Sequence, residues 1–424
     1  MSRPRPGDHE YRISRAFGVE YELGFPLAAG DGRQIAAELQ RISGLPCQYY
    51  AMSDASIYTV RDYWKLVPDS TVRFPADRER PETHRALELV SPKLKGAEGL
   101  AGTFAMVDAA AQLRAATNTT SGHHVHVDAT DMSVDEVKRV CVAFIAHEKV
   151  FDLLTSRSRQ GNDNPFCKSN QAALVRNTGG GSLQAALDAL AAAPTIQAVV
   201  RLVNPDVEDE GPRRADRHFK LNVTNLGGGG HGHGTIEFRL HQGTADPAKT
   251  MRWVEFLQRF VYHTRRREAY YAASPRDRTP AQLWLQLMHT MIGKAYLTSY
   301  CWKRIVELDG GNGPRRIVRA STDERQAVGE RWDPVRGLEA LQLEAPPPVR
   351  PPAAPRPPLP PAQPVRPPAP PRPPLPPAQP VRTPAPPRPP GAPPLPPARP
   401  VTQADLIARA RQIPNEDLDA PLLP

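Results

Sequence analysis

The stretch Ser121–Asp128, which reads SGHHVHVD, places three histidines and an aspartate within six residues. Side chains alternate between the two faces of a β-strand, so residues two apart share a face. A strand here therefore predicts that His124, His126 and Asp128 lie together, whereas His123 points the other way and has a structural role. Such a histidine pair is a metal-ligand pattern, and HxH on a strand also occurs in zinc sites.

Three further strand-like segments separate an apolar face from an ionisable one. They are FGVEYELGF with Glu20 and Glu22, ALELV with Glu88, and GTIEFRLHQ, in which Thr235, Glu237, Arg239 and His241 are predicted to share a face. A half-exposed sheet with salt bridges on its wet side would explain any one of these strands. Adjacent glutamates repel each other without a cation, and hard divalent cations take carboxylate oxygens. The four strands together favour a metal site, beside which the planar guanidinium of Arg239 suits phosphate or carboxylate.

Other polar residues could complete such a site. Arg157 and Arg159 follow a predicted helix, where they could equally be basic residues that interact with the helix C-terminus. Lys168 lies in PFCKSN, and Asn222 lies in FKLNVTNL, one strand before Thr235. The glycine-rich segment 227–234 lacks the GK[ST] of a P-loop, so a hairpin connection is the expected structure there.

The residue patterns predict short strands scattered among helices. Strands are expected at 17–25, 63–67, 86–90, 124–127, 219–223 and 235–240, and helices at 99–116, 134–154, 183–203, 247–266 and from 280 past 292. Ser133 and Glu136 fit a capping box, and Asp246 followed by Pro247 marks another helix start. Because strict βαβ alternation is absent, the pattern predicts an α+β fold with a mainly antiparallel sheet and helices packed on one face.

The chain has 424 residues, but its composition is not uniform. Residues 346–400 contain 30 of the 50 prolines, 7 arginines and no acidic residue. Such a segment cannot form a packed core and favours polyproline II. We expect a disordered N-terminus at 1–14, one catalytic domain over 15–340, a Pro/Arg-rich repeat linker at 346–400, and a short helix and tail at 401–424.

Charge and hydropathy exclude several classes of protein. The net charge of +9 includes +7 from the seven arginines of the linker, so the rest is mildly basic and no nucleic-acid partner is expected. No apolar run has the length of a membrane span, and the N-terminus lacks the apolar core of a secretory signal. The four cysteines show no CxxC spacing. We therefore expect a cytoplasmic protein without a membrane partner.

Taken in order along the chain, seven segments resemble the amidoligase family. They are FGVEYELGF, ELVSPKLKGAEGL, SGHHVHVD, SRSRQGN, CKSN, FKLNVTNL and TIEFRLHQGTADPAKTMRWVEFLQRFV. Each motif alone is common, but the ordered set is specific and covers about residues 15–265. That family is related to glutamine synthetase and glutamate–cysteine ligase, in the carboxylate–amine ligase superfamily.

The resemblance implies a curved antiparallel sheet whose concave face holds ATP and two or more Mg²⁺ or Mn²⁺ ions. The metal ligands that it implies are Glu20, Glu22, Glu88, Glu237 and one or both of His124 and His126. It assigns catalytic roles to Arg239, Glu237 and His126. The resemblance also implies that phosphate or substrate is contacted by Arg157, Arg159, Lys168 and Asn222.

The activity implied by the resemblance is amide formation. A carboxylate attacks the γ-phosphate of ATP to give an acyl phosphate, and an amine then displaces the phosphate. The carboxylate and amine substrates would be amino acids, peptides, proteins or cell-wall-type molecules.

Two other functions stay open at this point. The HxH pair is compatible with a metal-dependent hydrolase, although hydrolases of the HxH barrel type carry that motif early and add His and Asp at successive strand ends. The PxxP-type tail is compatible with a non-catalytic interaction protein that SH3- or WW-like domains recruit. The same tail could instead be a semi-rigid spacer.

Overall fold

The computed structural model describes residues 15–54, 59–75, 82–205, 216–227, 233–266 and 280–308. All of these residues belong to one compact unit. Several predicted features lie outside the described residues. They are the N-terminal segment 1–14, the glycine-rich residues 228–232, the repeat linker 346–400, and the helix and tail 401–424.

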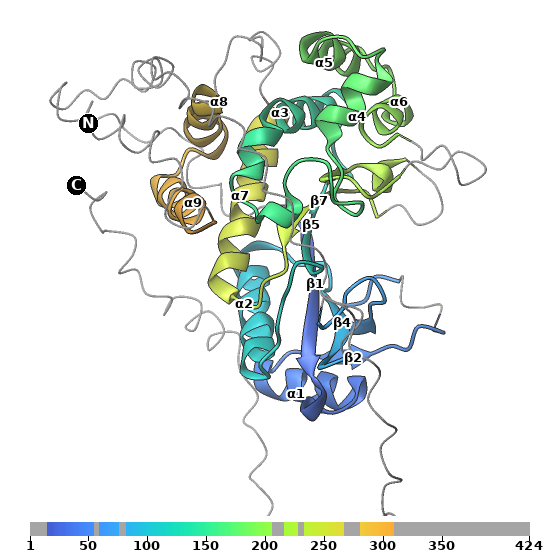
Figure 1. Cartoon of the computed structure of the whole chain (residues 1–424), viewed down its shortest axis with the longest axis vertical. Coiled ribbons are helices and arrows are strands. Elements are labelled where there is room, and N and C mark those ends of the chain that lie inside the picture. Colours follow the sequence, from blue (N-terminus) through green and yellow to red (C-terminus); the bar gives the residue numbers. More distant parts are fainter. Residues whose placement is uncertain are drawn as a thin grey trace, which may run out of the picture. The chain divides into compact units, whose positions relative to one another are not determined.

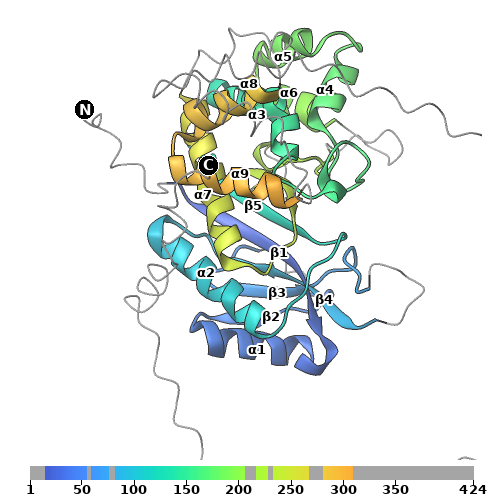
Figure 2. The same ribbon diagram turned by 60° about the vertical axis from the view of Figure 1, so that its left-hand side comes forward.

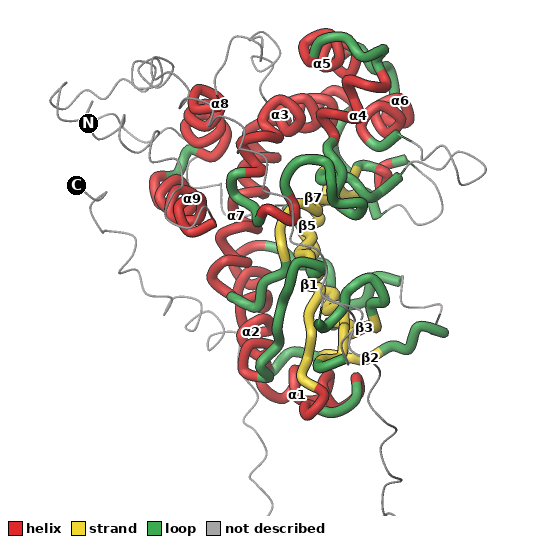
Figure 3. Tube along the Cα trace, in the orientation of Figure 1, coloured by secondary structure: helices red, strands yellow, loops and turns green. Residues whose placement is uncertain are grey.

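In the described part of the chain, seven strands form one sheet in the order β2-β3-β4-β1-β5-β7-β6. Figure 3 draws the strands in yellow, with red helices beside them. Their bounds are β1 Phe17–Pro26, β2 Cys47–Tyr49, β3 Trp64–Pro68, β4 His84–Val90, β5 Gly122–Asp128, β6 Leu221–Asn222 and β7 Thr235–Gln242. Every neighbouring pair is antiparallel except β2 and β3, which are parallel. The prediction of an α+β fold with a mainly antiparallel sheet is confirmed.

The helices mostly begin where their capping residues predict. Their bounds are α1 Gly32–Ser43, α2 Gly96–Gln112, α3 Val134–Asp152, α4 Asn170–Asn177, α5 Leu183–Ala191, α6 Ile196–Val203, α7 Pro247–Arg265, α8 Pro280–Gln286 and α9 Ala295–Leu308, with short 3₁₀ helices η1 Leu27–Ala29, η3 Arg157–Arg159 and η4 Thr224–Leu226 and a π-helical segment η7 Leu287–Ile292. Ser133 and Glu136 form the predicted capping box of α3. Asp246 accepts hydrogen bonds from the first turn of α7. No helix among the described residues is long and apolar enough to cross a membrane.

One face of the sheet is apolar because every second residue of its central strands is apolar and points to that face. Val19 and Leu23 of β1 are buried on this face. The ring of Phe238 in β7 lies with its centroid 5.8 Å from that of Phe144 in α3 and 6.2 Å from that of Phe260 in α7. Figure 1 shows α3 and α7 beside the central strands, and Figure 2 shows α7 crossing in front of them with α2 alongside. The opposite face is therefore left for the polar side chains.

The helical predictions need correction, because one predicted helix is divided and the helices α1 and α4 were not predicted. The predicted helix at 183–203 is two helices, α5 and α6, because Pro194 has no N–H to donate and Thr195 caps a new helix through Ala198. The helix α1 was not predicted, although its start is well marked. The Asp31 side chain accepts from the backbone N–H groups of Arg33 and Gln34, and Gln34 bonds back to Asp31.

Candidate active site

Four strands bring six ionisable side chains together on the face opposite the helices. The sheet register sets them across from one another in three pairs, Glu22 and Glu88, Glu20 and His124, and His126 and Glu237. These pairs form because β1 lies between β4 and β5, and β5 lies next to β7. All six side chains line one cavity of about 1030 Å³.

The carboxylates and imidazoles form two groups that share His124. Glu20, His124 and Glu237 offer ligand atoms within 4.8 Å of one another, and so do Glu22, Glu88 and His124. The Nδ1 atom of His124 lies 3.0 Å from Glu20 Oε2, and its Nε2 atom lies 3.5 Å from Glu22 Oε1. One imidazole thus stands between two candidate metal positions.

Glu88 is the least compensated carboxylate of the cavity. It makes no hydrogen bond or ion pair with any residue that the structure describes. Burial raises the pKa of Glu88 well above its usual range, and the anions Glu20, Asp69 and Glu22 raise it further. A cation would remove this repulsion. Carboxylate oxygens with an imidazole suit Mg²⁺ or Mn²⁺, so the residues present fit the expected ions.

In the group formed by Glu20, His126 and Glu237, nearby opposite charges shift the pKa of each side chain. Burial alone would raise the pKa of Glu237, but Arg239 and His126 lower it to about 2. Burial alone would lower the pKa of His126, but Glu237 and Glu20 raise it to about 9. The Nε2 atom of His126 lies 3.2 Å from Glu20 Oε1. A protonated imidazole cannot ligate a metal, so in this state His126 suits a phosphate oxygen and His124 is the better metal ligand.

Two guanidinium groups lie beside the carboxylates. Nη1 of Arg239 donates to Glu237 Oε1 at 2.5 Å, which holds the cation over the sheet. Arg159 is only 2% exposed, and its Nη2 lies 3.7 Å from Glu22 Oε2. Its side chain makes no hydrogen bond to any described residue, and its Nε is buried without a partner. A buried guanidinium with unused donors suits a ligand oxyanion.

Gly122 makes room for Arg159. A Cβ atom at this position would lie 2.8 Å from Nη2 of Arg159 and 2.9 Å from Nε2 of His124. The backbone N–H of Gly122 also donates to Glu22 Oε2. The glycine that opens β5 is therefore required by this close approach of side chains, and not by a turn.

The remaining predicted contacts divide into two groups. Arg157 lines the cavity, as does Asn222, whose Nδ2 donates to Glu237 Oε2 at 2.6 Å. Lys168 does not line the cavity, because its Nζ is 2.7 Å from Asp216 Oδ2. The structure thus separates Lys168 from the site that the sequence assigned to it.

The prediction for His241 is wrong. The pairing of β5 with β7 shifts between His123 and Val125, so that His123 lies opposite His241 and Val125 opposite Phe238. This irregularity places one extra residue on β7 and turns His241 to the apolar face, where its ring lies 5.0 Å from that of Trp253. Such bulges re-aim side chains beside active sites. The prediction that His123 points away from the site is confirmed.

Several cavity residues were missed by the sequence analysis. Lys65 of β3 is buried in the cavity wall, and its Nζ donates to the Thr59 carbonyl at 3.1 Å. Alternation could have found it, because Lys65 and Val67 face away from Trp64 and Leu66. Other missed residues are Asp69, Lys93, Asn164, Phe166, Arg217 and His218. These lie in loops and irregular segments, where no periodic pattern predicts which way a side chain points.

Comparison with known protein families gives a match. A family model described as "Putative amidoligase enzyme" matches residues 14–261, which is more than half of the chain. The match contains all six paired residues and both buried guanidiniums. No curated protein matches the chain.

Proposed function

Because the chain belongs to this amidoligase family, we propose that it is an ATP-dependent carboxylate–amine ligase. The observation that carries the proposal is the pairing, on one sheet face, of two carboxylate–imidazole groups with two buried guanidiniums. Phosphoryl transfer to a carboxylate needs this combination of cation ligands and oxyanion donors in one cavity.

The two carboxylate–imidazole groups would hold Mg²⁺ or Mn²⁺. One position has Glu20, His124 and Glu237 as ligands, and the other has Glu22, Glu88 and His124. When bound, the ions would supply positive charge that offsets the charge of the phosphate groups. The chain's own groups then orient the substrates around them.

The reaction has two steps. In the first, a carboxylate oxygen of the acid attacks the γ-phosphorus of ATP, the bond to the β-phosphate oxygen breaks, and ADP leaves. In the second, the amine nitrogen attacks the acyl carbon, inorganic phosphate leaves, and the nitrogen loses a proton. Arg239 and His126 stabilise charge on the transferring group, and Arg159 holds the acid. Without a bound ion, Glu237 and Glu20 outweigh burial and raise the pKa of His126 to about 9, which favours a proton on this ring.

The test is acid-dependent release of ADP in the presence of Mg²⁺. Hydroxylamine replaces the unknown amine, because it traps an acyl phosphate as a hydroxamate. We expect Glu22→Gln to abolish both products, since it removes a ligand, whereas Glu38→Gln on the exposed face of α1 serves as the matched control. ADP release that survives in Glu22→Gln and in Glu237→Gln would exclude the ligase.

The hydrolase alternative has less support. His124 and His126 are each surrounded by carboxylates, and an oxygen-rich set of this kind suits a hard cation better than zinc. Tightly bound stoichiometric zinc in the purified protein would favour the hydrolase over the ligase.

We propose that the proline-rich tail recruits a partner with an aromatic groove and has no part in catalysis. Deleting residues 346–424 should leave ADP release unchanged and abolish capture by SH3- or WW-like domains. Loss of activity in a truncated protein that keeps its fold, measured by circular dichroism, would contradict this separation of roles.

A further inference from the structure

The cavity has two different ends along the strands. At one end Thr235 of β7 pairs with Asp128 of β5. Further along β7, the backbone N–H of Arg239 donates to the carbonyl of Lys220, and the chain runs from there back to His218. We name the second region, with Arg159, Phe166, Arg217, His218 and Arg239, the Arg239 end.

An exposed aromatic ring lies at the mouth of the Arg239 end. Phe166 is 43% exposed, one of four large apolar side chains exposed among the described residues. Leu27 does not line the cavity, and Met52 and Val60 line it from the segment between β2 and β3, which are the strands farthest from β6 in the sheet. Apolar surface at the mouth of a polar cavity is typical of a ligand-binding site.

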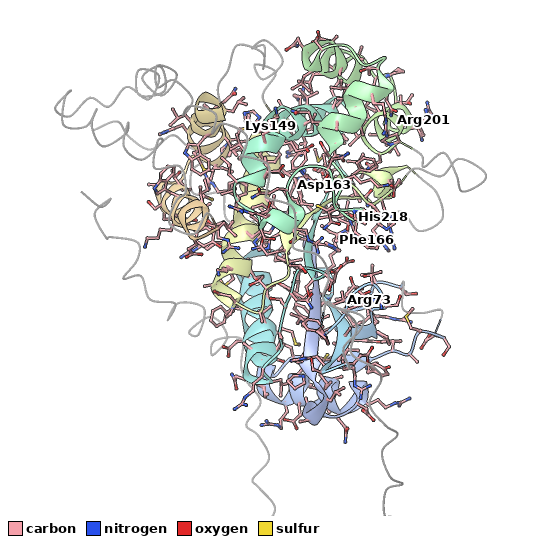
Figure 4. All side chains as sticks on the ribbon, in the orientation of Figure 1. Arg73, Lys149, Asp163, Phe166, Arg201 and His218 are labelled. Carbon is pink, nitrogen blue, oxygen red and sulfur yellow. The ribbon has the colours of Figure 1, made fainter. Side chains whose placement is uncertain are left out.

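The chain holds Phe166 in place. Its backbone N–H donates to Asn164 Oδ1 at 2.9 Å, and Asn164 Nδ2 donates to the carbonyl of Ser158 at 2.8 Å. The Phe166 ring meets the ring of His218 edge-on, with centroids 5.5 Å apart. His218 Nδ1 in turn lies 2.9 Å from Asp216 Oδ1. Phe166 and His218 therefore form a fixed aromatic platform, and Figure 4 shows them next to each other.

The same loop connects this platform to Arg159. Ser158, which accepts the Asn164 bond, precedes Arg159, and Cys167 Sγ lies 3.9 Å from the Arg159 carbonyl. The charged groups that line this end are Arg157, Arg159, Arg217 and Arg239, with Glu22, Asp163 and the Arg239 partner Glu237 as the anions. Cations are in excess here, and Arg159 has unused donors. An anionic ligand is favoured.

We infer that the Arg239 end selects the acid substrate, an inference that rests on the proposed function. Arg159 binds the carboxylate, and the platform of Phe166 and His218 packs against a large apolar group next to it. The substrate class is therefore an acid with an aromatic or branched aliphatic group beside the carboxylate, such as a peptide that ends in an apolar residue. Phe166 is the residue that determines this specificity.

The experiment compares two acids that differ only in the apolar group, N-acetylphenylalanine and N-acetylglycine. Their dissociation constants are measured by calorimetry on the full chain with Mg²⁺ and ADP. We expect the wild type to bind the phenylalanine acid about tenfold more tightly, which corresponds to about 1.4 kcal/mol. Phe166→Ala should bring this ratio close to one. Leu27→Ala, which removes an exposed side chain outside the cavity, should leave the ratio unchanged.

Two further measurements separate the possible outcomes. N-acetylphenylalanine amide lacks the carboxylate and should bind at least about tenfold more weakly than the acid, because Arg159 then has no anion to hold. A wild type that binds ADP but does not prefer the apolar acid would overturn the inference, as would a ratio that survives in Phe166→Ala. A wild type that binds neither ADP nor any acid would instead refute the proposed function.

Discussion

Two histidines of β5 lie three residues apart on opposite faces of the sheet, and their pKa values shift in opposite directions. His123 lies on the helix side, where its ring stacks on Tyr21 at a centroid distance of 4.5 Å, and burial lowers its pKa to about 3. His126 lies on the cavity side, where Glu237 and Glu20 raise its pKa to about 9. The neighbouring charges that the register provides, and not the sequence motif, decide the charge of each ring.

The two faces also differ in what they contribute. The helix face buries apolar side chains and stabilises the fold. The cavity face gathers four glutamates that repel one another in the absence of a cation, so it lowers stability in exchange for a binding site. Substitutions on alternate residues of one strand should separate these contributions.

The largest effect is expected at Glu237, on the cavity side of β7. Glu237→Gln removes a carboxylate that bonds both Arg239 and Asn222. We expect the rate of acid-dependent ADP release to fall by about a thousandfold or more, equivalent to about 4 kcal/mol of transition-state stabilisation. The melting temperature should change little. A variant that loses its fold together with its activity would weaken the distinction between the faces.

The next effect is expected at Phe238, the adjacent residue on the helix side. Phe238→Ala removes a fully buried ring that contacts Phe144 and Phe260. We expect the free energy of unfolding to drop by about 3 to 5 kcal/mol, measured in urea. Below its melting temperature the variant should keep most of its activity. Loss of activity in a folded variant would show that the two faces are coupled.

A smaller effect concerns pH and separates the two histidines. Between about pH 6.5 and 9 the folded protein keeps a proton on His126 that the unfolded chain has lost, so this stabilising contribution is present below 6.5 and disappears as pH rises through about 9. His123 has the opposite sign, because its neutral buried ring costs stability as pH falls from about 6.5 toward 3.

His126→Gln tests the alkaline half of this difference. We expect the wild type to lose about 1 to 3 kcal/mol of unfolding free energy between pH 6.5 and 9 that the variant does not lose, with a chelator present throughout. Equal pH profiles for both proteins would contradict the assigned charge of His126.

The smallest effect is expected at Glu88, which has no partner among the described residues. Glu88→Gln should raise the unfolding free energy of the metal-free protein by about 1 kcal/mol, because it removes a repelled carboxyl from the cavity. The same variant should lose the further stabilisation that Mg²⁺ gives to the wild type. A lower stability without metal would argue against carboxylate repulsion at this site.

The period-two pattern predicted much of the cavity face. Glu20, Glu22, His124, His126 and Glu237 all point where alternation places them, since a strand offers only two faces. The pattern failed at His241, where one extra residue on β7 reverses the alternation. Local sequence does not reveal such a bulge, because it arises from the pairing of two strands that lie far apart in the chain.

The fold class, the ordered motifs of the family and the faces of the strands could be predicted from the sequence. Three features could not: β1 pairs with both β4 and β5, Lys168 turns to Asp216, and Arg159 is buried beside Gly122. The tertiary structure also placed Phe166 at the mouth of the cavity. The reason is the distance along the chain over which each interaction acts. Alternation and capping act between residues a few positions apart, whereas strand order, ion pairing and burial depend on neighbours that only the folded chain brings together.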